Sequence, residues 1–289
     1  PNTKWGFFQF FSFGFLFFVP TTDTGTPDGY LPDNALLTLA NDHMNSLVAE
    51  DNATTMDSAV SGSGCYDSWD AAAANAPAPI VDLADWINHH ADLGAHDPNL
   101  PPAFRFLSIS EFPVTPTCGV LHVGVPFSTG DETGRQIQIK AADLGICMVD
   151  DMEQVWVNPT GGDSGLRMRD SLDTVTTHVD RASILAVLGE DVDRRRRADN
   201  GIPFVVVEVH GDDSTSPVPG VRYVQAALTG AGWIVEYRTS NRHFRLDQEV
   251  LDDENALGYI SRVLGQYSAG EDEGFFDHRW EDVSAELIV

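Results

Sequence analysis

The segment from Trp5 to Val19 constrains the fold of this chain more than any other, because nine of its residues are Phe or Trp. It is shorter than the roughly 20 apolar residues that span a bilayer, and two glycines, a glutamine and a serine interrupt it. Phe and Trp favour strands, whereas Gly and Ser weaken a helix. We therefore expect an extended strand or arm that is covered either by its own chain or by a neighbouring molecule.

If the arm is not covered by its own chain, its aromatic side chains are the predicted partner-binding surface. They are Trp5, Phe7, Phe8, Phe10, Phe11, Phe13, Phe15, Phe17 and Phe18. The expected partners are other protein subunits in a homo- or hetero-oligomer, and contact with a bilayer is the less favoured alternative. Neither a signal peptide nor a full transmembrane helix is expected, because only Lys4 precedes the run and no small-residue cleavage site follows it.

A large excess of carboxylates restricts the environment in which the chain can stay folded. It has 44 Asp and Glu residues against 17 Lys and Arg, which gives a formal charge of -27. The carboxylates repel one another in dilute buffer, whereas molar salt shortens the Debye length to about 3 Å and screens the repulsion. We expect a protein of a high-salt environment, either in the cytoplasm of a halophile or in the virion of a virus that infects one. An acidic protein from ordinary salt is the alternative.

The charge also restricts the partners. An acidic surface repels duplex DNA, so binding to duplex nucleic acid is not expected. The basic run from Arg194 to Arg197 fits a helix C-terminus, where cations meet the negative end of the helix dipole. Cys65, Cys118 and Cys147 are far apart and odd in number, which predicts buried thiols and not a disulfide framework.

The pattern along the chain predicts an α+β protein in four parts. They are an aromatic N-terminal arm and loop (1–32), a helical and irregular segment (33–100), a β-rich section (101–175) and an α/β ferredoxin-like unit (176–289). Helices are predicted from Asp33, which can cap its first turn, and from Ile80 to Leu93. We find no internal sequence repeat. The strands predicted in the β-rich middle section are at 104–109, 119–125, 136–139 and 154–157.

The last part of the chain has the clearest pattern. Asp180 can cap a helix whose apolar face includes Ile184 and Leu188. A Val-rich strand of the kind buried on both faces is predicted next. Together with the elements after it, it has the order of a split βαββα, ferredoxin-like unit. These elements are the strand at 203–209, a helix at 221–228, a hairpin of strands at 233–237 and 243–246, and a helix at 253–266.

One short motif suggests nucleophilic catalysis. Gly162-Asp163-Ser164-Gly165 is similar to the nucleophile motif of chymotrypsin-like serine proteases, which would make Ser164 the nucleophile and His122 its base. The resemblance covers four residues, because Leu166 and Arg167 stand where that family has Gly-Pro. A glycine-rich turn accounts for the same residues.

A second motif suggests a metal. Cys118 and His122 are four residues apart and would share one face of a strand. With Cys147, His89 or His90 they could bind zinc, which needs about four such ligands in a tetrahedral arrangement. No second close pair is present, so we expect a buried thiol and a surface histidine, with no metal site and no cofactor.

The cluster with the strongest link to chemistry lies at the C-terminal end of the Val-rich strand. Glu208 and His210 lie there, and ligands usually bind at this end of strands in open α/β sheets. Asp212 and Asp213 follow them, and His243 could face them across the predicted hairpin.

This arrangement loosely resembles the core of archaeo-eukaryotic primases, with an acid on a strand and a histidine in a hairpin that contains Ser240. The resemblance implies a metal-dependent enzyme with Glu208, His210 and His243 as its catalytic residues. That family uses two strand aspartates to bind its metal, and Glu208 and His210 stand in their place. The histidine motif is also spaced differently, so the likeness extends to topology and not to the metal pair.

The two functional hypotheses belong to different classes. The first is a non-enzymatic structural or assembly protein, such as a virion or capsid-associated component, and it depends on the aromatic arm. The second is a metal-dependent enzyme with its site at the end of strand 204–209. The sequence favours the first, because it contains no complete catalytic constellation.

The charge imbalance yields a direct test. We expect the melting temperature to rise markedly between about 0.1 M and about 3 M potassium chloride, because added ions screen the repulsion among carboxylates. Differential scanning calorimetry measures this shift. Equal melting temperatures at the two salt concentrations would contradict adaptation to high salt.

Overall fold

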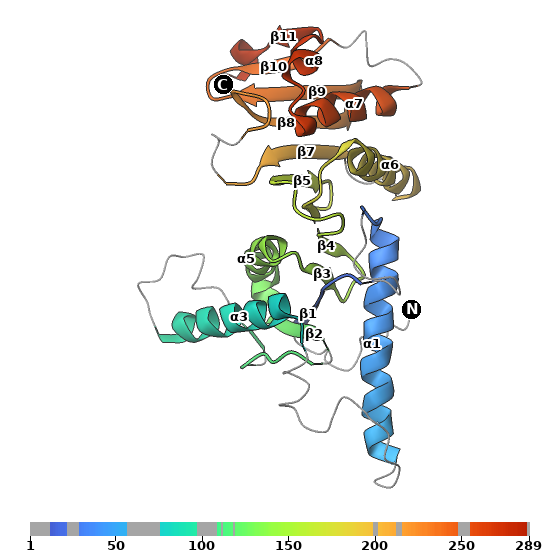
Figure 1. The fold of residues 1–289 in the computed structure, drawn as a ribbon, viewed down its shortest axis with the longest axis vertical. Helices are drawn as coiled ribbons and strands as arrows, with labels where there is room; N and C mark the ends of the chain where they lie inside the picture. The colour runs from blue at the N-terminus through green and yellow to red at the C-terminus, as the bar shows by residue number, and fades with distance from the viewer. Residues whose placement is uncertain are drawn as a thin grey trace. The chain divides into compact units, whose positions relative to one another are not determined.

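A computed structural model describes residues 12–21, 29–56, 76–96, 109–110, 112–117, 119–198, 202–211, 216–247 and 255–287. The chain is of the α+β class and divides into two compact units (Figure 1). Unit 1 comprises residues 1–27 and 33–159, and unit 2 comprises residues 28–32 and 160–289. Among the helices of the described ranges, none is long and apolar enough to cross a membrane.

Unit 1 has a four-stranded sheet in the order β4-β3-β1-β2, in which each neighbouring pair is antiparallel. The predicted helices that begin near Asp33 and Ile80 are confirmed, as are the strands near 119–125 and 154–157. Residues 104–108 of the predicted strand at 104–109 lie outside the described residues. The elements are β1 (Ser12–Phe18), α1 (Asp33–Met56), α3 (Ala78–His96), β2 (Val120–Pro126), η1 (Phe127–Thr129), α5 (Gly130–Asp143), β3 (Cys147–Asp150) and β4 (Val155–Asn158).

The aromatic strand β1 lies between β2 and β3 and is buried on both faces. Gly134 lets α5 approach one face closely, because a Cβ at that position would lie 2.8 Å from the Phe15 ring. On the other face, the ring centroid of Phe18 lies 5.1 Å from that of His43 in α1. Phe15, Phe17 and Phe18 are each 0% exposed, so β1 forms the centre of the core of unit 1.

For the described part of the segment, this burial decides between the two alternatives, because the strand is covered by its own chain. Phe15, Phe17 and Phe18 pack inside their own chain and are not available as partner-binding residues in this fold. The reason is that covered faces on both sides leave a strand no exposed position. Phe13 remains partly exposed. The other predicted contact residues, Trp5, Phe7, Phe8, Phe10 and Phe11, lie outside the described residues.

The predicted strand at 136–139 is wrong, because these residues form part of α5. Ile137 and Ile139 alternate as in a strand, but only Ile137 is buried, and Ile139 is 57% exposed. Ile137 shares its buried face with Ala141, one helical turn later. Burial at a spacing of four residues therefore outweighs the short alternating pattern.

Unit 2 has a seven-stranded sheet in the order β6-β5-β7-β8-β9-β10-β11, and its neighbouring strands are antiparallel. The predicted hairpin is confirmed as β9 and β10, and the last predicted helix is confirmed as α7. The elements are β5 (Leu166–Asp170), β6 (Val175–Thr176), α6 (Arg181–Ala198), β7 (Phe204–Val209), β8 (Val221–Thr229), β9 (Gly232–Thr239), β10 (His243–Leu246), α7 (Ala256–Ala269), α8 (Asp272–Phe276), β11 (Trp280–Asp282) and η4 (Ser284–Leu287).

One face of this sheet packs on α6 and α7 to form the hydrophobic core of unit 2. Val205 and Val207 of β7 and Val224 of β8 are fully buried in it. The helices contribute residues such as Leu188 and Leu264, which are also fully buried. Because strand side chains alternate between faces, the residues between these valines lie on the opposite face.

Helix α6 begins after Asp180, as predicted. The Asp180 carboxylate accepts the backbone N–H of Ser183 at 2.7 Å, and the Ser183 hydroxyl accepts the N–H of Asp180 at 2.9 Å. This reciprocal cap satisfies two backbone donors at the helix start. The arginine run lies in the last turns of α6, and there Arg194 forms ion pairs with Asp170 and Asp191.

The predicted helix at 221–228 is wrong, and the ferredoxin-like unit is not confirmed. These residues form β8, which pairs with β7 and β9. Val224 and Ala226 are buried, while Tyr223 and Gln225, which alternate with them, are partly exposed, and this is the alternation of a strand with one covered face. β7 alternates in the same way, so it is covered on one face and not, as predicted, on both.

The two units share a chain connectivity that the sequence does not reveal. In unit 1, β2 and β3 flank β1 and are joined through α5, and β4 follows beside β3. In unit 2, β6 and β7 flank β5 and are joined through α6, and β8 follows beside β7. Each unit therefore contains a split βαβ arrangement in which an antiparallel strand separates the two strands joined through the helix.

The central position of β1 predicts a large cost for truncating it. Phe15→Ala should lower the free energy of unfolding by about 3–5 kcal/mol, because it leaves a cavity between β1 and α5. Ile139→Ala, at a position of α5 that is 57% exposed, serves as the control and should change the stability little. Urea unfolding in molar potassium chloride measures both. Similar losses for the two variants would show that β1 is not core.

Candidate functional site

A row of polar side chains crosses the face of the unit 2 sheet opposite α6 and α7. Arg167 of β5 pairs in register with Glu208 of β7, which pairs with Tyr223 of β8. Tyr223 pairs with Arg238 of β9, and Arg238 pairs with His243 of β10. Since directly paired residues of neighbouring strands point to the same face, these five side chains form one row.

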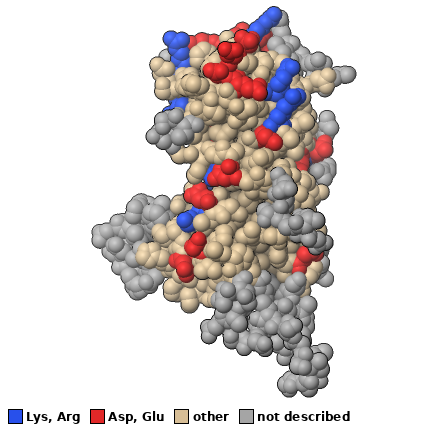
Figure 2. All heavy atoms as spheres, viewed as in Figure 1, with Lys and Arg blue, Asp and Glu red and all other residues tan. Residues whose placement is uncertain are grey.

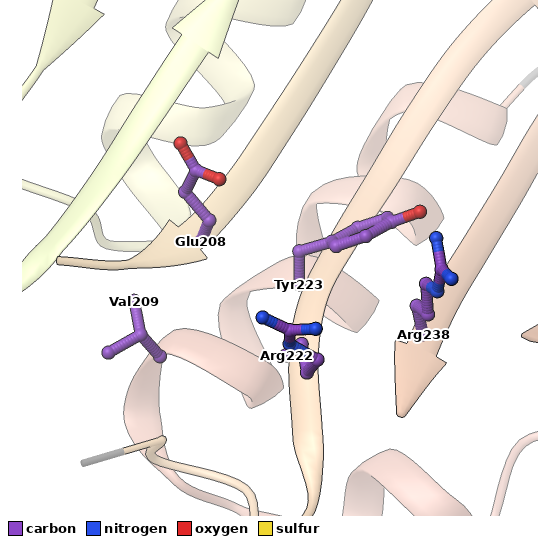
Figure 3. A pocket seen from close by; sticks show the side chains of 5 residues that line it. All are labelled: Glu208, Val209, Arg222, Tyr223 and Arg238. Carbon is purple, nitrogen blue, oxygen red and sulfur yellow. The ribbon is translucent and has the colours of Figure 1, made fainter. Parts of the chain in front are cut away.

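A pocket of about 240 Å³ opens along this row, at the C-terminal end of β7 (Figure 3). In Figure 3 the ring of Tyr223 extends toward Arg238, and Glu208 stands on the neighbouring strand. Two guanidinium groups, a phenol and a carboxylate therefore face the same hollow. The lining residues are Glu208, Val209, Arg222, Tyr223 and Arg238.

A β-bulge lets two consecutive residues of β8 line the pocket. Val221 lies opposite Thr239, whereas Tyr223 lies opposite Arg238, so the register shifts by one residue. Consecutive residues of a regular strand point to opposite faces. The bulge changes the direction of Arg222, which joins Tyr223 at the pocket.

Three groups at the pocket retain hydrogen-bonding capacity. Within the described ranges, the side chains of Tyr223 and Arg238 form no hydrogen bond or ion pair. Glu208 lies 3.8 Å from Nη2 of Arg169, which is longer than a hydrogen bond, and its side chain is 45% exposed. A ligand can therefore gain new hydrogen bonds at all three.

Other arginines on this face are already engaged by carboxylates. Arg167 donates to Asp163 at 2.8 Å, and this hydrogen bond holds the pKa of Asp163 below its usual range. Arg245 donates to Glu236 at 2.9 Å and to Glu286 at 3.0 Å. Burial alone would lower the pKa of Arg245, but the two carboxylates raise it. These ion pairs join neighbouring parts of unit 2 and leave little charge for a ligand.

His243 lies at the end of the row but does not open to the pocket surface. Its side chain is 8% exposed, and Nε2 lies 3.2 Å from a carboxylate oxygen of Glu236. That contact lacks the alignment of a hydrogen bond, and neither ring nitrogen has a hydrogen-bond partner. The backbone N–H of His243 donates to the Ser284 hydroxyl at 2.9 Å, which ties η4 to β10.

The structure does not bring the three predicted catalytic residues together. Glu208 and His243 are separated by β8 and β9, which is about 14 Å between backbones at roughly 4.8 Å per strand. His210 follows β7 and is exposed. Asp212 and Asp213 lie outside the described residues. Glu208 alone belongs to the pocket.

Neither of the two short motifs forms a catalytic or metal site among the described residues. The Ser164 hydroxyl donates to the carbonyl of Thr177 at 2.9 Å and accepts the N–H of Val179 at 3.1 Å, so it links a loop to the start of α6. Cys118, which with His122 forms the pair considered and not favoured as zinc ligands, lies outside the described residues. Among the residues that are described, no group of three or more His, Cys, Asp or Glu side chains is placed to hold a metal ion.

Three residues of the pocket were not predicted from the sequence: Arg222, Tyr223 and Arg238. In the predicted helix at 221–228, Arg222 and Tyr223 would point in different directions. No sequence pattern distinguishes Arg238 from the other arginines. The alternation that begins at Tyr223 is the only local signal for a strand, and the bulge before it shortens that signal.

The positive charges of the chain are concentrated in unit 2. Thirteen of the 17 Lys and Arg residues lie in residues 160–289. Figure 2 shows that most of the blue surface in view covers this unit, interspersed with carboxylates. The same residues contain 24 of the 44 Asp and Glu, so the pocket lies in a unit that is rich in arginine although its net charge is also negative.

No protein-family model matches the chain, and comparisons with curated proteins and with solved structures found no similar protein. Function must therefore be inferred from the geometry of the units themselves.

Proposed function

We propose that unit 2 is a binding module for a small phosphate-bearing ligand, held in the pocket at the C-terminal end of β7. The observation that supports this most is the guanidinium of Arg238, which has no partner among the described residues and faces the pocket beside Tyr223 and Arg222. Guanidinium groups bind phosphate oxygens through two parallel hydrogen bonds. Binding is proposed in preference to catalysis, because the three predicted catalytic residues lie apart.

The net charge of the molecule affects how such a ligand must be held. The charge of -27 does not attract anions from a distance, and molar salt would screen such an attraction in any case. Affinity must then come from short contacts inside the pocket. Arginine hydrogen bonds and packing on an aromatic ring both persist better than long-range attraction when ions are abundant.

Replacing the unpaired arginine tests this proposal. Arg238→Gln should weaken binding of inorganic phosphate at least about tenfold, because it removes charged hydrogen bonds. Isothermal titration calorimetry in molar potassium chloride measures the dissociation constant. Arg279→Gln is the matched control, since Arg279 is another exposed arginine of unit 2 and does not line the pocket. Equal affinities of the wild type and Arg238→Gln would refute a phosphate site here.

A second proposal keeps the assembly function predicted from the aromatic segment, as expected for a structural or virion component. It is supported by a partly exposed aromatic cluster at the start of β1. The ring centroid of Phe13 lies 6.4 Å from that of Phe127 and 6.5 Å from that of Trp156. Phe127 is 61% exposed, more than Phe112 and Phe276, the other exposed phenylalanines among the described residues. The proposed occupant is a second copy of the chain.

Size-exclusion chromatography with light scattering tests assembly. Phe127→Ser should convert an oligomer of the wild type into smaller species, because it removes apolar area from the interface. Phe276→Ser, at a position of unit 2 that is 46% exposed, should leave the mass unchanged. A wild type that is monomeric in molar potassium chloride, or a Phe127→Ser variant with the mass of the wild type, would exclude this interface.

A further inference from the structure

We infer that Glu208 makes the pocket selective for phosphate esters that bear hydroxyl groups, with sugar phosphates as the ligand class. This inference rests on the proposed phosphate-binding function and identifies the chemistry at the other end of the same pocket. A site for an anion that has no O–H or N–H group would gain nothing from a carboxylate, because like charges repel. The presence of Glu208 in the lining therefore indicates a ligand that also donates hydrogen bonds.

The spacing of the row sets the length of the ligand. Glu208, Tyr223 and Arg238 are direct register partners on three adjacent strands. At about 4.8 Å per strand, the backbones of the first and last lie about 10 Å apart. A ligand must then present its phosphate at the arginine end and its donors at the glutamate end. A five- or six-membered sugar ring with a terminal phosphate has this polarity.

The Glu208 carboxylate is able to accept such donors. Its contact with Arg169 is 3.8 Å long, so its oxygens are not occupied by that guanidinium. Its side chain is 45% exposed, which leaves it accessible from the pocket. Hydrogen bonds from hydroxyl groups to a carboxylate are charge-assisted and short.

Arg169 also distinguishes between classes of donor. A ligand with an ammonium group beside Glu208 would place a second positive charge near the guanidinium of Arg169. Like charges at this range are unfavourable, whereas a neutral hydroxyl group meets no such penalty. Hydroxylated phosphate esters are therefore favoured over zwitterionic ones.

Tyr223 lies between the two ends of the pocket. Figure 3 shows its ring extending along the hollow from β8 toward Arg238. The apolar C–H face of a sugar can pack on an aromatic ring, and the phenol can donate to or accept from a ring hydroxyl. The row thus offers contacts for the phosphate, the ring and the hydroxyl groups of one ligand.

Calorimetric titration with three probes tests this assignment: inorganic phosphate, ribose 5-phosphate and phosphoethanolamine. The wild type should bind ribose 5-phosphate about tenfold more tightly than inorganic phosphate, because hydrogen bonds to the carboxylate are added. Glu208→Met should bring this ratio close to one while it preserves or improves the affinity for inorganic phosphate. Glu281→Met, on the edge strand β11, is the matched control and should retain the wild-type ratio.

Each contrary outcome has a distinct meaning. If the wild type binds inorganic phosphate and ribose 5-phosphate equally, or if Glu208→Met keeps the preference, the role of Glu208 is overturned while the phosphate site stands. Tighter binding of phosphoethanolamine than of ribose 5-phosphate overturns the assignment to hydroxylated ligands. If inorganic phosphate does not bind to the wild type at all, the proposed function itself fails, and this inference fails with it.

Discussion

Hydrophobic packing of α6 and α7 against one face of the unit 2 sheet is the interaction on which the pocket depends. It commits alternate residues of β7, β8 and β9 to the core, and the residues between them must then lie on the other face. Glu208, Tyr223 and Arg238 become neighbours because the pairing register places them side by side, although 30 residues of sequence separate the first from the last. The burial of one set of alternate residues in the apolar core thus places the polar residues of the pocket together on the other face.

Unit 1 uses its aromatic residues differently. A strand with Phe at most positions would promote aggregation if it were an exposed edge strand. Instead, β1 lies between β2 and β3, and helices cover both of its faces. Gly134 is part of this arrangement, since any larger residue there would collide with the Phe15 ring. The same composition that suggests an arm for binding partners therefore supplies the centre of a core.

Elements whose start or periodicity is determined by nearby residues are predicted correctly from the sequence. Elements whose short apolar runs fit both a helix and a strand are not. The start of α1 at Asp33 and the cap of α6 at Asp180 are found because both depend on nearby residues. Residues 136–139 and 221–228 are assigned to the wrong class, because short apolar runs fit both periods and tertiary packing decides between them. The strand β7 is predicted correctly, but its burial on one face only is not. That burial depends on which other elements cover the strand.

The candidate site could be predicted only in part for the same reason. Glu208 was identified from its position at the end of a Val-rich strand, which is a local property. Its neighbours across the sheet depend on register, and His243, which the sequence placed beside it, belongs to a strand three positions away in the sheet. Pairing between distant segments is set by the whole core and is not encoded in any single window.

The bulge in β8 makes the pocket sensitive to chain length at one position. Loss of Arg222, the one residue between Val221 and Tyr223, would restore a regular ladder with β9 and would remove one of the two guanidinium groups that line the pocket. The fold would tolerate that deletion better than the site would, since Val221, which is 1% exposed, would stay opposite Thr239 on the covered face of the sheet. A one-codon insertion or deletion at this point would therefore change the lining of the pocket while the core of unit 2 stays intact.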